Sequence, residues 1–534
     1  MASEWEIDPE NGEVRPTGTP VPTESPSPTP TPDDSIFGDF TYRIIDNAAI
    51  ITGLSANWNA YKTVLAIPAE MDGAPVNAIG DNAFSEQTNM VTITLPETLE
   101  SIGAYAFSDC DSIVVMHIPD SVVEMGEGVF SGCDNLIEVN VPTNIEVINT
   151  FTFRNCSNLL YLSIPESILK IGEGAFSGCT QLLDIAMNNS LTSIGKEAFK
   201  DCKGLISLYM PDSVLTLGEG ALYNCTGLIE IYLSDSLTQI RDNTFKGCGK
   251  IQSLVLPENI TSIGAYAFSY CENITELIIP STVNYIGEYA FERCKSLISI
   301  NIPPLITLIN DGTFYGCIML SEIELPSALS IIGDAAFQGC NSLSNFRIPD
   351  SVQSIGERAF AACSSITDIS LPEGLGIVSY HLFSGCSELV SITIPSSIRS
   401  LEDGAFSSCS RLKSIELPDS ITIIPDYSFF RCYELTSIII PMATTNIGYH
   451  AFYYCENLTT ITLQENIQKI GDGAFLTNSG LETTLYVYSV YPPKITHLGL
   501  STELTSIFVP AQAINNYMNS PDWLIYKDSI NSME

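Results

Sequence analysis

Sixteen cysteines carry the most reactive side chains of this 534-residue chain, and they recur every 23 residues from Cys110 to Cys455. An even number of cysteines is typical of a disulfide framework in an exported protein. A metal site instead needs closely spaced ligands such as Cys-x-x-Cys, and the sequence contains none. A catalytic thiol is a single residue paired with a base, whereas these cysteines are equivalent to one another.

The regular interval also argues against disulfides. Equivalent positions in stacked repeats place their Cα atoms about 4.8 Å apart with parallel Cβ vectors, whereas a disulfide brings the Cβ atoms to about 3.8 Å. A free cysteine behaves as a small, buried apolar residue. We therefore expect a ladder of sixteen reduced thiols inside the protein.

Other catalytic motifs are missing from the sequence. The histidines lack the His-Glu-x-x-His spacing of a zinc protease, and Gly249-Lys250 is followed by Ile251 instead of the Ser or Thr of a phosphate-binding loop. No Gly-x-Ser-x-Gly motif occurs, and no unit between residues 84 and 475 carries an insertion. The sequence therefore predicts no enzyme activity and no metal or other cofactor. The histidines are His117, His381, His450 and His497.

Counting from each Cys as position zero, the repeats share one pattern. Ile or Leu occupies +3, aliphatic residues recur at +6 and +8, Pro follows at +9 in 14 of 17 units, and Ala-Phe is usual at +19 and +20. The Phe column runs from Phe84 to Phe475 through eighteen units, with Leu222 as its one substitution. One unit alone cannot bury these side chains, so the pattern predicts a solenoid with continuous interior ladders.

Each unit is expected to hold one short strand and a tight return. Residues +5 to +8, as in Ser391–Ile394, alternate polar and apolar like a half-buried strand. Pro at +9 has no amide proton, so it ends the strand. The following Ile-Gly-x-x-Ala-Phe segment is too short for a long helix and fits a single helical or 3₁₀ turn.

The combined pattern Leu-x-x-Ile-x-Ile-Pro-x-Ser-Val-x-x-Ile-Gly-x-x-Ala-Phe-x-x-Cys resembles the bacterial BspA-like leucine-rich repeat family. The resemblance implies a curved leucine-rich repeat solenoid of about eighteen 23-residue units over residues 76–480. Residues 37–75 resemble the family's N-terminal β cap, and residues 481–534 resemble its C-terminal cap. Family members are typically surface or secreted proteins, and some are adhesins.

Charge and the N-terminal segment bear on partner and location. With 62 acidic and 22 basic residues the formal charge is −40, which disfavours nucleic acids and anionic membranes as partners. No apolar run of 18 residues predicts a transmembrane segment. Residues 1–36 include a Pro-, Ser- and Thr-rich stretch from 16 to 32, which predicts a flexible, extended stalk. With the resemblance, this stalk favours an extracellular or cell-surface location, the signal or anchor being no part of this sequence.

Acidic residues recur at +17, just before Ala-Phe, in twelve of eighteen units. A calcium ladder is one interpretation of this column. We favour carboxylates that complement exposed backbone amides at the start of a turn, because no Asp-rich calcium-loop pattern is present.

The outward strand positions +5 and +7 form the surface that can select a ligand. Most +7 residues are small and polar, but four consecutive units carry Tyr209, Tyr232, Val255 and Ile278. Such a stripe is typical of a recognition patch, although aromatic and β-branched residues also favour strands in their own right. In leucine-rich repeat proteins this sheet forms the concave face. The candidate ligand-binding residues are Tyr161, Tyr209, Tyr232, Val255, Ile278, Glu230 and Glu276.

Three functions fit these features. The first is an exported cell-surface interaction or adhesion scaffold that binds a protein on a host or neighbouring cell through the concave sheet. The second is a surface glycan-binding protein whose tyrosines stack on sugars. The third is a structural spacer of the envelope without a selective ligand.

Overall fold

A computed structural model describes residues 34–533 except 60, 345, 477–481, 497 and 502–503, together with two short strands near the N-terminus, β1 (Trp5–Ile7) and β2 (Val14–Pro16). These two strands pair antiparallel. The Pro-, Ser- and Thr-rich stretch of the predicted stalk lies outside the described residues, apart from Pro16.

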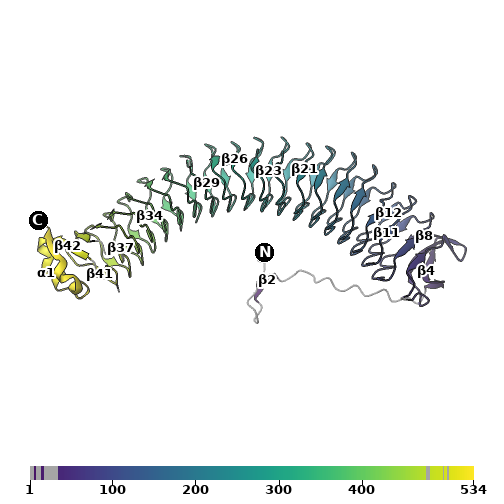
Figure 1. Cartoon of the computed structure of the whole chain (residues 1–534), viewed down its shortest axis with the longest axis horizontal. Coiled ribbons are helices and arrows are strands. Elements are labelled where there is room, and N and C mark those ends of the chain that lie inside the picture. Colours follow the sequence, from purple (N-terminus) through teal and green to yellow (C-terminus); the bar gives the residue numbers. More distant parts are fainter. Residues whose placement is uncertain are drawn as a thin grey trace.

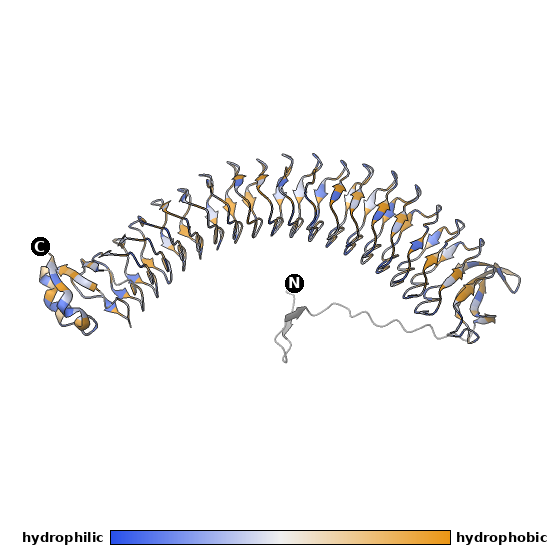
Figure 2. Cartoon of the chain, viewed as in Figure 1, coloured by the Kyte–Doolittle hydropathy of each residue, from blue (hydrophilic) through white to orange (hydrophobic). Residues whose placement is uncertain are grey.

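The repeats stack into a long arc (Figure 1). Each unit turns once around the interior, and hydrophobic segments recur in unit after unit along the whole arc (Figure 2). The predicted leucine-rich repeat solenoid is confirmed. Among the described residues, no helix is long and apolar enough to cross a membrane.

The first strand column follows the predicted positions +5 to +7. Its strands pair parallel with their counterparts one unit away, as Tyr161 pairs with Asp184 and Ser163 with Ala186. The column contains β6 (Val64–Ala66), β9 (Thr92–Thr94), β11 (Val115–Met116), β13 (Glu138–Val139), β15 (Tyr161–Ser163), β17 (Asp184–Ala186), β19 (Ser207–Tyr209), β21 (Glu230–Tyr232), β24 (Glu276–Leu277), β26 (Ser299–Asn301), β28 (Glu322–Glu324), β31 (Asp368–Ser370), β33 (Ser391–Thr393), β36 (Ser437–Ile439) and β38 (Thr460–Leu463).

A second strand column at +14 and +15 was not predicted, so the expectation of one strand per repeat is corrected to two. The second residue of each pair is buried beneath the first, and neighbouring units again pair parallel. The column contains β10 (Ser101–Ile102), β12 (Glu124–Met125), β14 (Val147–Ile148), β16 (Lys170–Ile171), β18 (Ser193–Ile194), β20 (Thr216–Leu217), β22 (Gln239–Ile240), β23 (Ser262–Ile263), β25 (Tyr285–Ile286), β27 (Leu308–Ile309), β29 (Ile331–Ile332), β30 (Ser354–Ile355), β32 (Ile377–Val378), β34 (Ser400–Leu401), β35 (Ile423–Ile424), β37 (Asn446–Ile447), β39 (Lys469–Ile470) and β41 (Lys494–Ile495).

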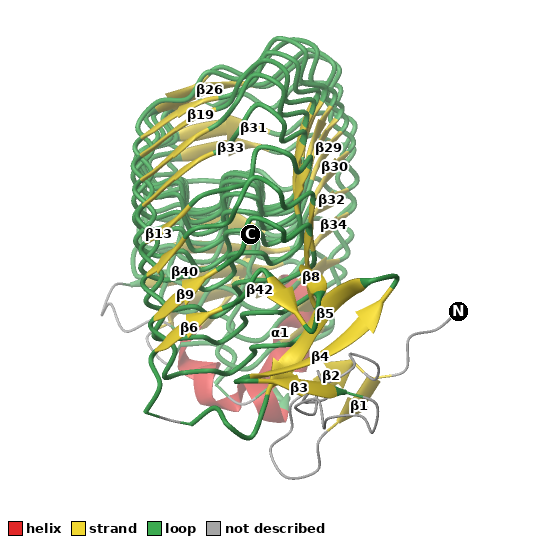
Figure 3. Ribbon diagram, turned by 90° about the vertical axis from the view of Figure 1, so that its right-hand side faces the viewer, coloured by secondary structure: helices red, strands yellow, loops and turns green. Residues whose placement is uncertain are grey.

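The two strand columns lie on opposite flanks of the arc. Figure 3 looks along the arc from its N-terminal end and shows β19, β26 and β31 on one side and β29, β30 and β32 on the other. The expectation that the +5 to +7 sheet forms the concave face is therefore corrected. Backbone hydrogen bonds hold both columns at the same strand spacing, so the arc bends about an axis that compresses neither column relative to the other.

The return segment at +17 to +22 contains bonds typical of a 3₁₀ turn but does not continue as a helix. Ser108 N–H donates to the Tyr105 carbonyl three residues earlier, at 3.1 Å. Tyr105 (φ 54°) and Asp109 (φ 55°) are left-handed, and the same two positions are left-handed in the following units. The amides consequently point along the stack, and Phe107 N–H donates to the Val129 carbonyl of the next unit at 2.9 Å.

Carboxylates at +17 join neighbouring units. The Ala265 N–H donates to Asp242 Oδ1 at 2.8 Å, and the Glu357 N–H donates to Asp334 Oδ1 at 2.7 Å. This hydrogen bonding confirms the favoured interpretation of these Asp residues, although the amide that each one meets belongs to the next unit. Among the residues that the structure describes, no group of three or more His, Cys, Asp or Glu side chains could hold a metal ion.

The interior is built from ladders of identical side chains. The rings of Phe245, Phe268 and Phe291 lie 5.2 and 5.4 Å apart and nearly parallel. All sixteen cysteines are free and buried, which confirms the predicted thiol ladder. The Cys271 thiol donates to the Phe245 carbonyl, 26 residues earlier, at 3.2 Å, and the other cysteines repeat this bond.

Different elements close the two ends of the stack. An antiparallel sheet of β3 (Ser35–Phe37), β4 (Phe40–Ile45) and β5 (Ala48–Leu54) continues through β8 (Ala74–Ile79), flanked by β7 (Glu70–Met71), into the second column. The Phe40 ring meets the Phe84 ring edge-on at 6.4 Å and covers the start of the Phe ladder. The C-terminal end holds β40 (Thr483–Val487), β42 (Leu504–Pro510), η1 (Ala511–Ala513), α1 (Ile514–Met518), η2 (Pro521–Ser529) and β43 (Ile530–Met533).

Candidate ligand-binding surface

The predicted +7 stripe is exposed on the flank that carries the first strand column. Tyr209 is 65% exposed, Tyr232 59%, Val255 84% and Ile278 77%. The residue before each of them is buried, because successive side chains of a strand point to opposite faces and the +6 residue fills the interior. Outward apolar side chains on four consecutive units are therefore set by the strand pattern.

Backbone pairing brings the two tyrosines of the stripe together. Tyr209 of β19 is in register with Tyr232 of β21, and their rings lie 6.0 Å apart at 45°. The Met210 N–H donates to the Tyr232 carbonyl at 2.9 Å. Residues 251–257 of the next unit form no strand, so Val255 stands on a segment where the first column is interrupted.

Two further apolar residues that sequence reasoning missed adjoin the stripe. Ile206 is 50% exposed and Ile229 is 41% exposed, both at +4. Their backbones are bonded, since the Ile229 N–H donates to the Ile206 carbonyl at 2.9 Å. Bulky aliphatic residues at a position that precedes the strand were the available signal. We define the flank patch as Ile206, Tyr209, Ile229, Tyr232, Val255 and Ile278.

The predicted carboxylates flank this patch, whereas Tyr161 does not belong to it. Glu230 and Glu276 are exposed at +5 of β21 and β24, on the same strands as Tyr232 and Ile278. Tyr161 is 59% exposed at +5 of β15, two units before Tyr209 and in the other row. The structure therefore brings six of the seven predicted residues to one surface and leaves Tyr161 beside it.

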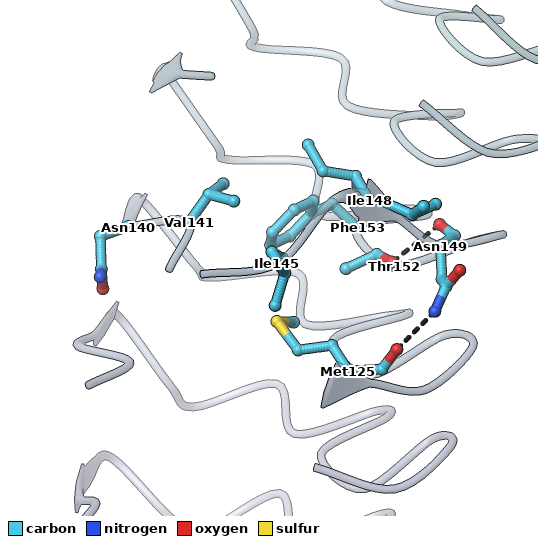
Figure 4. A pocket seen from close by; sticks show the side chains of 9 residues that line it. Met125, Asn140, Val141, Ile145, Ile148, Asn149, Thr152 and Phe153 are labelled. Atoms are coloured by element: carbon cyan, nitrogen blue, oxygen red, sulfur yellow. Dashed lines mark hydrogen bonds between the residues drawn. The ribbon is translucent and has the colours of Figure 1, made fainter. Parts of the chain in front are cut away.

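Recesses elsewhere in the chain offer less. The recess around Met125, Ile145 and Phe153 leaves no volume for a water-sized molecule (Figure 4). Its polar side chains are engaged, as the Thr152 hydroxyl donates to the Asn149 carbonyl at 2.8 Å and the Asn149 amide donates to the Met125 carbonyl.

Two open grooves of about 540 and 510 Å³ lie along the second column near the C-terminal end and share Asp403 and Pro425. Their carboxylates serve the backbone, since Asp403 Oδ1 accepts the Asp426 N–H at 3.1 Å and Asp426 Oδ1 accepts the Tyr449 N–H at 2.6 Å. These grooves therefore belong to the inter-unit hydrogen bonding of the stack.

The histidines on the return segments are packing residues. Burial lowers the pKa of His381 and of His450, so both rings are neutral at neutral pH. The His450 ring lies between Tyr449, at 3.8 Å, and Tyr453, at 4.2 Å. His497 lies outside the described residues. With no nucleophile and base brought together here, this geometry suits binding and not bond making.

Comparison with known proteins agrees with the repeat pattern. The model of the BspA type leucine rich repeat region matches residues 77–206, 146–275, 192–320, 261–390 and 377–499. The chain belongs to the BspA-type leucine-rich repeat family. The predicted resemblance is thereby confirmed over most of the solenoid.

Solved structures include similar BspA-type solenoids. A leucine-rich repeat protein from Bacteroides ovatus is 27% identical over 80% of this chain and 94% of that chain, with a TM-score of 0.51. A leucine rich cell surface protein from Faecalibacterium prausnitzii is 25% identical over 79% of this chain and 95% of that chain, with a TM-score of 0.37. No curated protein matches the chain.

Proposed function

We propose that this BspA-type protein is an extracellular or cell-surface scaffold that binds a macromolecule through the flank patch, the partner being a protein on a host or neighbouring cell. The observation that carries the proposal is the row of outward apolar side chains from Tyr209 to Ile278, each more than half exposed. Apolar surface of this kind gains free energy when a partner covers it. Tyrosine adds contact area with a polar group at its tip.

Three further features support this role. The patch stands on paired backbone instead of on a long loop, so binding orders few residues and costs little conformational entropy. Location outside the cell is supported by family membership and by the Pro-, Ser- and Thr-rich segment that precedes the solenoid. The formal charge of −40 favours partners with cationic surfaces.

The experiment compares the wild-type chain with Tyr209→Ala/Tyr232→Ala on immobilised matrix proteins and on a glycan array. We expect the double variant to lose at least about tenfold in affinity for the protein ligand, because central aromatic residues dominate such interfaces. Its thermal unfolding should stay nearly unchanged, since both rings project from the stack.

The matched control is Tyr285→Ala, which removes a 48% exposed tyrosine from β25 on the opposite flank. Equal binding by the wild type and the double variant would rule out the flank patch. Binding confined to the glycan array would favour the glycan-binding function, and the absence of any ligand would favour the structural spacer.

A further inference from the structure

The +5 row beside the flank patch alternates between acidic residues and serine. Counted along the units, the row carries Asp184, Ser207, Glu230, Ser253, Glu276, Ser299 and Glu322. Its four carboxylates are exposed, and none of them pairs with Lys or Arg among the described residues. These units also carry no Lys or Arg at +5 or +7.

The alternation gives the surface two spacings. Neighbouring strands of a sheet lie about 4.8 Å apart, so the apolar +7 row offers one side chain per about 4.8 Å along the arc. The carboxylates occur in every second unit, so they are about 9.6 Å apart. Two residues along a strand, about 6.6 Å, separate the acidic row from the apolar row.

An α-helix lying along the arc matches both spacings. One helical turn advances about 5.4 Å, and seven residues advance about 10.5 Å. The apolar stripe of such a helix meets one unit with each turn, and a basic residue once per heptad meets each carboxylate. An extended chain repeats a face every two residues, about 6.6 Å, which matches neither row. A polyproline helix repeats every three residues, about 9.3 Å, and meets only the acidic row.

Resting on the binding role proposed above, we infer that the partner of the flank patch is an amphipathic helix with one Lys or Arg per heptad, which lies across the strands from β17 to β28. Its apolar stripe packs on Tyr209, Tyr232, Val255 and Ile278. Its basic residues pair with the free carboxylates of Asp184, Glu230, Glu276 and Glu322. Opposite charges in this arrangement set the direction and register of the helix and speed its association.

The test uses the full chain and two synthetic helical peptides of about four heptads. Both have the same Leu, Arg and Ala composition. In the matched peptide Arg recurs once per heptad beside the Leu stripe, and in the permuted peptide all Arg residues are gathered at one end. Fluorescence anisotropy gives the two dissociation constants. We expect the matched peptide to bind at least about tenfold more tightly, because only it can pair with successive carboxylates.

Charge reversal locates the binding on the chain. Glu230→Lys/Glu276→Lys should weaken the matched peptide at least about tenfold. The control Glu146→Lys/Glu258→Lys reverses two exposed carboxylates outside the +5 row and should leave binding unchanged. Unchanged thermal unfolding of both double variants shows that they remain folded.

Equal binding of the two peptides, binding unaffected by Glu230→Lys/Glu276→Lys, tighter binding of a Pro-rich peptide with the same charge spacing, or no binding at all would each overturn the inference. The outcome is separable from that of the proposed function. If Tyr209→Ala/Tyr232→Ala loses the protein ligand while the two peptides bind alike, the flank patch stands and the helical partner is wrong.

Discussion

Leu208 and Tyr209 are adjacent in β19, but the stack constrains them very differently. Leu208 is 1% exposed and Tyr209 is 65% exposed. Every residue at +6 is apolar, whereas the +7 column includes Thr, His, Asn, Tyr, Glu and Arg. An inward side chain meets its equivalents in the units on both sides, so one change disturbs two interfaces. An outward side chain meets solvent or a ligand, so it can vary without loss of the fold.

Alkaline pH should have the largest effect on the inward side of this comparison. Burial raises the pKa of the Cys110 and Cys386 thiols to about 12, and raises that of most other ladder thiols well above the ordinary value. The stability that each thiol contributes is complete below the pKa of an unfolded thiol and is lost as the pH rises toward the raised value. The loss amounts to about 1.4 kcal/mol per pH unit for each thiol that ionises only on unfolding.

With so many equivalent thiols, we expect the urea midpoint to fall steeply between pH 8.5 and 10, whereas a thiol reagent should find few reactive groups in the native chain at pH 8 and close to sixteen after denaturation without reductant. A midpoint that is flat across this range would show that the thiols ionise without unfolding.

Removing one ring from the Phe ladder is the next largest effect. Phe268 is fully buried, and its ring stacks on Phe245 and on Phe291. Phe268→Ala leaves a cavity between two units, which should lower the free energy of unfolding by about 3–5 kcal/mol. The outward control Tyr232→Ala should change it by less than about 1 kcal/mol. Urea unfolding of both variants decides the matter, and equal losses would erase the difference between the two faces.

A turn glycine should show a smaller but distinct effect. Gly404 has φ +64°, and a Cβ there would lie 2.4 Å from His381 Cε1. Gly404→Ala should therefore cost about 1–3 kcal/mol. The control Gly376 has no atom within 4 Å of such a Cβ and no left-handed backbone, so Gly376→Ala should be nearly neutral. His381→Ala in the Gly404→Ala background should recover only part of the loss, because the positive φ remains.

The features that the sequence alone predicts are those that repeat without change. The 23-residue interval, the Cys and Phe columns and the alternation at +5 to +8 led directly to the solenoid, to its first strand column and to its buried thiols. The exposed residues Tyr209 to Ile278 followed from the same alternation, because a period of two assigns every side chain of a strand to one face.

Other features depend on contacts between units that one repeat does not encode. The second strand column consists of two residues per unit, which is too short for an alternation to be visible. The position of the first column on a flank depends on the relative spacing of whole columns. Ile206 and Ile229 precede the strand, so their exposure beside the stripe required the path of the backbone.

The hydrogen bonds between units all run one way, and this gives the stack a direction. The return-segment amides of each unit donate toward the C-terminus, and the last unit still finds acceptors, since Phe475 N–H donates to the Gly499 carbonyl at 3.0 Å. The thiols donate in the opposite direction, back to the preceding unit. A shortened version of this protein would therefore need a closing piece that supplies carbonyl oxygens at its new C-terminal face, whereas its new N-terminal face would present unused acceptors that water can serve.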